Sequence, residues 1–80
     1  MFRTLVHTEV IDVDGRSYVA NFFERKTSRG SRRYTCEIAL PGNERIILDD
    51  DSMTSLSTKV ARIAPAMMYS RTLGSGPKAA

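Results

Sequence analysis

Five cationic side chains lie within residues 25–33, and no anionic side chain interrupts them. They are Arg25, Lys26, Arg29, Arg32 and Arg33. The segment holds five of the twelve Lys and Arg residues in the 80-residue chain. Clustered cations can neutralise the phosphates of a nucleic acid and release its counterions, which makes binding depend on salt. The alternative interpretation is a solvated loop whose charges discourage aggregation at strand edges.

Other residue types that could support chemistry are sparse. His7 and Cys36 are the candidates for a base and a nucleophile, and we expect them on opposite sides of a sheet. The consecutive carboxylates of residues 49–51 suit the positive end of a helix better than a metal site. The sequence has neither a glycine-rich phosphate loop nor a His/Glu metal helix. We therefore expect a protein that is not an enzyme and holds no metal or other cofactor.

The composition is ordinary for a globular domain in water, with 41% hydrophobic and 26% charged residues. A net charge of +3 favours acidic partners slightly. No apolar run approaches the roughly 20 residues that cross a bilayer, and the N-terminal residues do not resemble a signal peptide. A single cysteine indicates a reducing environment, so we expect a cytoplasmic protein with no membrane partner. A chain this short buries only about 60% of its unfolded surface, which favours self-association.

The pattern of the chain predicts strands over residues 4–13, 17–26, 34–40 and 45–48, followed by a helix. Asp14-Gly15 between strand-like segments is typical of a two-residue hairpin turn. The helix is expected to begin at Asp51 or Ser52 and to kink or restart at Pro65. The predicted fold is α+β: an antiparallel meander of four strands, or three if 45–48 is no strand, with one C-terminal helix on one face. We expect one domain over residues 1–72 and a disordered tail over 73–80.

The turn at Asp14-Gly15 predicts the register of the first hairpin, with Ile11 opposite Tyr18. If the second loop spans residues 27–32, one face of the sheet is the predicted core. Its residues are Val6, Val10, Val19, Phe23, Cys36, Ile38 and Leu40. A helical stripe is expected to cover them, namely Met53, Leu56, Val60, Ile63 and Met67. Met68 and Tyr69 are expected to lie off that stripe.

A single helix cannot cover both sides of a sheet, so the other face is predicted to be exposed and apolar. Monomeric proteins seldom leave a large apolar patch unused. With Tyr18 and Phe22 on that face, we expect bases of single-stranded or structured nucleic acid to stack there while the five cations contact phosphates. The alternative is a homodimeric or protein-interaction module that buries the same face against a second subunit or a protein partner.

The order of four meandering strands and one helix, with a basic hairpin and aromatic residues on the strands, resembles single-strand-binding folds of the Whirly and Pur-alpha type. The resemblance covers residues 4–70 in topology. It implies a dimer that binds single-stranded nucleic acid through its sheet.

Overall fold

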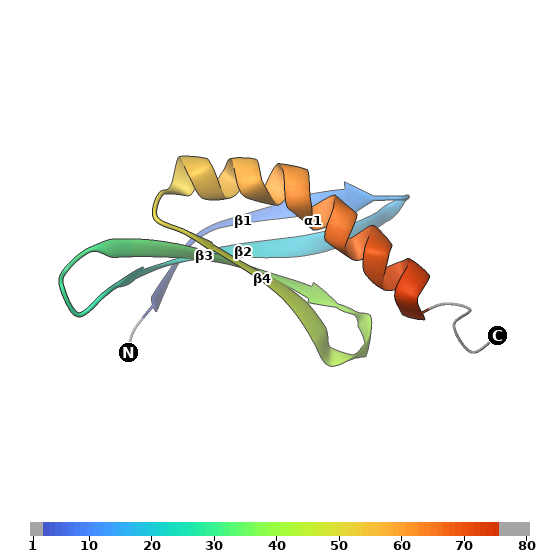
Figure 1. The fold of residues 1–80 in the computed structure, drawn as a ribbon, viewed down its shortest axis with the longest axis horizontal. Coiled ribbons are helices and arrows are strands. Elements are labelled where there is room, and N and C mark those ends of the chain that lie inside the picture. Colours follow the sequence, from blue (N-terminus) through green and yellow to red (C-terminus); the bar gives the residue numbers. More distant parts are fainter. Residues whose placement is uncertain (1–2, 76–80) are drawn as a thin grey trace.

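Four antiparallel strands form one sheet, and a single C-terminal helix packs on it (Figure 1). The structure is a computed structural model that describes residues 3–75, with side chains described as far as Tyr69. The strands are β1 (Arg3–Val13), β2 (Arg16–Lys26), β3 (Arg32–Leu40) and β4 (Glu44–Asp50), followed by helix α1 (Met53–Ser75). A short 3-10 turn over Pro41–Asn43 joins β3 to β4. The order of strands in the sheet is β1-β2-β3-β4, which confirms the predicted α+β meander.

The turn between β1 and β2 has the predicted geometry. Asp14 and Gly15 both have positive φ, 53° and 78°, as a tight hairpin with the twist of its strands requires. The register follows from it, with Ile11 opposite Tyr18 and His7 opposite Phe22. Beyond His7 the register shifts by one residue, so that Leu5 rather than Val6 lies opposite Phe23. Val6 is therefore the extra residue of a β-bulge.

The loop between β2 and β3 is one residue shorter than expected, because Thr27 closes it. The amide of Thr27 donates to the carbonyl of Ser31 at 2.7 Å, and the amide of Gly30 donates to the carbonyl of Thr27 at 2.9 Å. The Thr27 hydroxyl accepts further bonds from the amides of Arg29 and Ser31. Lys26 thus pairs with Arg32 instead of Arg33.

This one-residue difference reverses the predicted faces of the first two strands, because side chains alternate along a strand. Phe22 lies opposite Cys36, and Ala20 lies opposite Ile38. The predicted core positions Val10 and Val19 are instead exposed on the face away from the helix, and Val6, in the bulge, is exposed as well. We call the face that α1 covers the helix face and the other one the outer face. The buried core is Ala20, Phe22, Cys36, Ile38, Ile46, Leu56, Val60, Ala64 and Met68.

Helix α1 lies over β3 and β4 and buries one stripe. Ser52 begins it as predicted, because its hydroxyl accepts a hydrogen bond from the amide of Ser55 at 3.1 Å. The helix continues through Pro65 and bends near its middle (Figure 1). The prediction for its stripe is wrong at Ile63, which is exposed, and at Met68, which is buried.

The described part of the chain is elongated, with principal extents of 50 × 21 × 16 Å. The β2–β3 loop, the start of β1 and the start of α1 lie at one end (Figure 1). The helix extends to Ser75, past the predicted domain boundary at residue 72, and residues 76–80 of the predicted tail lie outside the described residues. Within the described residues, no helix is long and apolar enough to cross a bilayer.

Substitution of the adjacent residues Phe22 and Phe23, which lie on opposite faces of β2, tests the register directly. Phe22→Ala should lower the free energy of unfolding by about 3–5 kcal/mol, because it leaves a cavity in the core. Phe23→Ala, on the outer face, should cost less than half as much. Urea unfolding of both variants measures the difference. Equal losses, or a larger loss for Phe23→Ala, would contradict the register described above.

Candidate nucleic-acid interface

The five cations of the predicted binding segment are divided between the two faces of the sheet. Arg25 and Arg33 are paired across β2 and β3 on the outer face. Lys26 and Arg32 are the next pair along the same strands, and strand alternation places them on the helix face. Arg29 is exposed in the loop between them. A single ligand surface therefore includes at most part of the predicted set, unless the ligand wraps around the hairpin.

The outer face carries a row of three arginines across neighbouring strands. Arg3 of β1 lies opposite Arg25 of β2, and Arg25 lies opposite Arg33 of β3. Like charges directly opposite one another destabilise a sheet. Arg3 belongs to this row through the β1–β2 register and lies far from the basic segment in the sequence, which is why sequence reasoning missed it.

The two outer arginines of this row have acidic partners, whereas the central one does not. Arg3 forms an ion pair with Glu37, whose pKa is lowered mainly by the hydrogen bond from Arg3. Arg33 forms one with Asp49, with 2.6 Å between Nη2 and Oδ2. Among the described residues, no carboxylate lies within ion-pair distance of Arg25. The row thus retains an unneutralised cation at its centre.

Apolar and aromatic groups border the arginine row. The guanidinium of Arg3 lies over the Phe23 ring, 3.8 Å from its centroid. Phe23 precedes Arg25 by two residues and lies beside it on the outer face, and Leu5 lies opposite Phe23. Further along the sheet the outer face exposes Val10, Val19 and Ile47. An exposed face with apolar side chains is therefore present, although Val10, Val19 and Phe23 lie on it where Tyr18 and Phe22 were expected.

The helix-face cations lie in a different environment. Arg32 forms an ion pair with Glu24 at 3.6 Å, and Glu24 also accepts a hydrogen bond from the Tyr34 hydroxyl at 3.0 Å. Lys26 is exposed next to them, directly opposite Arg32. The aromatic neighbour of this pair, Tyr34, is half-buried and packs against the core.

The expectation that Tyr18 and Phe22 form an exposed stacking surface is wrong. Phe22 has no exposed surface, and Tyr18 is half-buried and packs against the core. Both lie on the helix face because the second hairpin has the shorter loop. Phe23, which sequence reasoning placed in the core, is the aromatic residue of β2 on the outer face.

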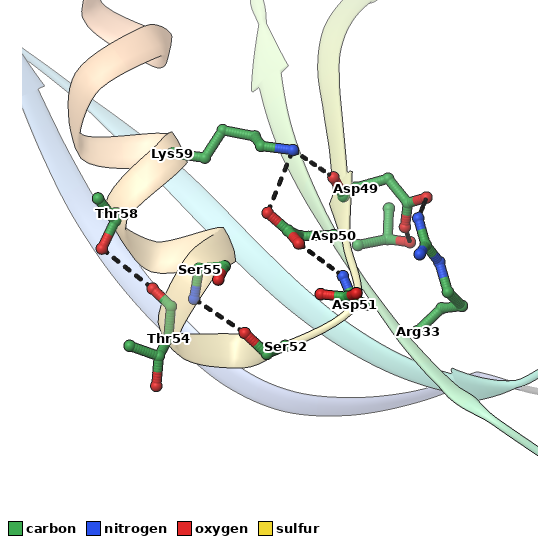
Figure 2. Close-up of polar contacts among 10 residues, drawn as sticks. Arg33, Asp49, Asp50, Asp51, Ser52, Thr54, Ser55, Thr58 and Lys59 are labelled. Atoms are coloured by element: carbon green, nitrogen blue, oxygen red, sulfur yellow. Dashed lines mark hydrogen bonds and ion pairs between the residues drawn. The ribbon is translucent and has the colours of Figure 1, made fainter.

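Polar contacts of the three consecutive aspartates, residues 49–51, connect the start of the helix to the sheet (Figure 2). Lys59 of α1 donates to the carbonyl oxygen of Asp49 at 2.8 Å, and its Nζ lies 3.2 Å from Oδ2 of Asp50. The amide of Asp51 donates to Oδ1 of Asp50, which is the main reason that the pKa of Asp50 is lowered. Asp49 also accepts from Arg33, so the cluster joins β3, β4 and α1.

His7 and Cys36 lie on the same face of the sheet, which corrects the expectation of opposite faces. Phe22 lies between them, opposite both residues in its two ladders. The rings of His7 and Phe22 are in contact, with centroids 5.4 Å apart. Burial, followed by the charges of Glu9 and Glu37, raises the pKa of Cys36 to about 12. A thiol in this state is a poor nucleophile, because the thiolate is the reactive form.

Within the described residues, no group of three or more His, Cys, Asp or Glu side chains could hold a metal ion. Comparisons with protein-family models, with curated proteins and with solved structures found no match to this chain. The resemblance to the Whirly and Pur-alpha type therefore extends no further than the order of strands and helix.

The role of Lys59 can be tested by removing its charge. Lys59→Met should lower the free energy of unfolding by about 1 kcal/mol, because the Asp49 carbonyl and the Asp50 carboxylate lose their shared donor. Arg62→Met, an exposed site on the same helix, is the matched control and should change stability little. Urea unfolding at neutral pH measures both. An equal effect at the two sites would show that the contacts of Lys59 do not stabilise the helix start.

The buried thiol of Cys36 should make the free energy of unfolding depend on pH in the alkaline range. Because the pKa of Cys36 is raised from 9.0 to about 12 in the folded chain, the stability from its neutral thiol is complete below about pH 9. It should be lost as pH rises from about 9 to about 12. Unfolding of the wild type and of Cys36→Ala across this range isolates the effect, since the tyrosines are common to both. Parallel curves for the two proteins would contradict it.

Proposed function

We propose that this chain is a small, non-enzymatic binding protein whose ligand is single-stranded or structured nucleic acid. The observation that carries the proposal is Arg25, which has no carboxylate partner among the described residues and lies between Arg3 and Arg33 in the register. The three arginines lie opposite one another in the register, and the guanidinium groups of the outer two form ion pairs with Glu37 and Asp49, so only the charge of Arg25 is left without a carboxylate among the described residues. A polyanion lying along the row supplies the missing negative charge.

The surroundings of the row suit a nucleic acid better than a small anion. The guanidinium plane of Arg3, which lies over the Phe23 ring, and that of Arg25 offer surfaces on which bases stack, while the charges attract the phosphates. Arg29, exposed at the tip of the neighbouring loop, extends the cationic surface beyond the sheet. The proposed interface therefore consists of Arg3, Phe23, Arg25, Arg29 and Arg33, and it replaces the predicted Tyr18 and Phe22.

Lys26 and Arg32 keep a secondary part in the proposal. They lie on the helix face at the same end of the sheet, so a longer strand that passes around the hairpin tip would meet them. A cytoplasmic location belongs to the same proposal. It is supported by the lone Cys36, which is buried and unpaired, as thiols are in a reducing compartment.

The proposal predicts a binding defect specific to one face. Arg25→Glu should abolish the binding of a short fluorescent oligonucleotide at low salt, because it reverses the charge at the centre of the row. Lys26→Glu makes the same change on the adjacent residue of the helix face and should weaken binding less. Arg62→Glu on the exposed surface of α1 should leave it almost unchanged. Fluorescence anisotropy measures all three against the wild type.

Salt dependence provides a second readout of the same interface. If four arginines contact phosphates, the logarithm of the association constant should fall with the logarithm of salt concentration at a slope of about −3. Absent or salt-insensitive binding would refute the proposal. Equal defects in Arg25→Glu and Lys26→Glu would place the ligand around the hairpin tip. Binding of a protein in place of nucleic acid would favour the alternative of an interaction module.

A further inference from the structure

Strand β1 is exposed on both faces and along one edge. Every residue from Arg3 to Val10 is exposed, and Val10 is the most exposed large apolar side chain, at 61%. The strand is the first in the order β1-β2-β3-β4, so only one of its two sides is paired. Its 11 residues make it a long edge strand, a form that folded proteins usually cover or interrupt.

The register with β2 shows which backbone groups face the open edge. In an antiparallel ladder, hydrogen-bonded and non-hydrogen-bonded pairs alternate, and a two-residue turn is closed by a hydrogen-bonded pair, here Val13 and Arg16. Residues of the non-hydrogen-bonded pairs direct their N–H and C=O groups away from β2. Counted from the turn and across the bulge at Val6, these residues are Asp12, Val10, Thr8, Leu5 and Arg3.

We propose that β1 pairs antiparallel with β1 of a second copy of this chain, about a two-fold axis through Thr8. Thr8 then lies opposite Thr8 of the other copy, and His7 lies opposite Glu9. Past the bulge at Val6, Leu5 lies opposite Val10, Thr4 opposite Ile11, and Arg3 opposite Asp12. The result is one continuous sheet of eight strands, which does not depend on the proposed function.

This arrangement satisfies two geometric requirements. The edge-directed residues pair only with edge-directed ones: Thr8 with Thr8, Leu5 with Val10, and Arg3 with Asp12. The faces also match, since each of those pairs lies on the outer face, whereas His7 and Glu9 lie on the helix face. The bulge makes this possible, because it changes the face of the residues before Val6 relative to those after it.

Charge complementarity favours a second copy as the occupant of this edge. Each dimer would contain two Arg3–Asp12 ion pairs and no directly opposed like charges, and each His7 imidazole would lie opposite a Glu9 carboxylate. The other edge strand behaves differently. The same two-fold pairing of β4 about its central residue, Ile47, would place Arg45 opposite Asp49, but it would also oppose the carboxylates of Glu44 and Asp50. Pairing of β1 with itself thus avoids opposed like charges, whereas the same pairing of β4 does not.

A charge exchange between Arg3 and Asp12 tests the proposal. Arg3→Asp and Asp12→Arg should each raise the dimer dissociation constant by about tenfold or more, because each opposes like charges at two places in the dimer. The double variant should restore it. The two residues are nine positions apart on one strand, about 30 Å, so they cannot compensate each other within one chain. Sedimentation equilibrium from micromolar to millimolar protein measures the dissociation constants.

A backbone variant tests the edge itself. Thr8→Pro removes an edge-directed N–H that β2 does not use, and proline is tolerated on edge strands, so the variant should be a folded monomer. Thr8→Val keeps the N–H and should remain dimeric. Circular dichroism of both variants establishes that they are folded.

Two results would overturn the proposal. One is a wild-type protein that stays monomeric at millimolar concentration. The other is a dimer that survives Thr8→Pro but is lost in Val19→Glu, since Val19 lies on the outer face of β2, away from the edge. That second result would assign the dimer to packing of the outer faces. Failure of the double exchange to restore the dimer would refute the Thr8-centred register.

Discussion

Coverage of a four-stranded sheet by a single helix is the constraint on which the rest of this structure depends. Helix α1 lies over β3 and β4 and forms one core with residues of β2, β3 and β4. Around Phe22, Cys36 and Ile38 the helix face is apolar and buried. The outer face has no covering element among the described residues and still carries several large apolar side chains. One layer of helix thus divides the sheet into a structural side and a side available for contacts.

Which residues occupy each side is decided by the loop between β2 and β3. Thr27 accepts two amide hydrogen bonds through its hydroxyl and joins Ser31 through the backbone, which sets a five-residue loop. A loop longer by one residue would move Phe22 to the outer face and Phe23 into the core. A few local hydrogen bonds therefore select between two arrangements with very similar hydrophobic content.

The same register concentrates charge at one end of the outer face. Arg25 and Arg33 reach that face through β2 and β3, and Arg3 joins them through the bulged end of β1. Arg3 and Arg33 are held by Glu37 and Asp49, so the row is partly compensated within the chain. The Asp49 ion pair is in turn part of the cluster that fastens α1 to β4 (Figure 2). The proposed interface and the fold are consequently stabilised by shared contacts.

The sequence by itself determined the features that depend on neighbouring residues. The Asp14-Gly15 turn, the four strands and the cap at Ser52 were all predictable, because each reflects the conformational preferences of a few adjacent residues. Tertiary structure alone decided which face is buried and which cations share a surface. Both strand faces of the first hairpin are apolar, so periodicity could not distinguish them, and a difference of one residue in the loop after β2 reverses the choice.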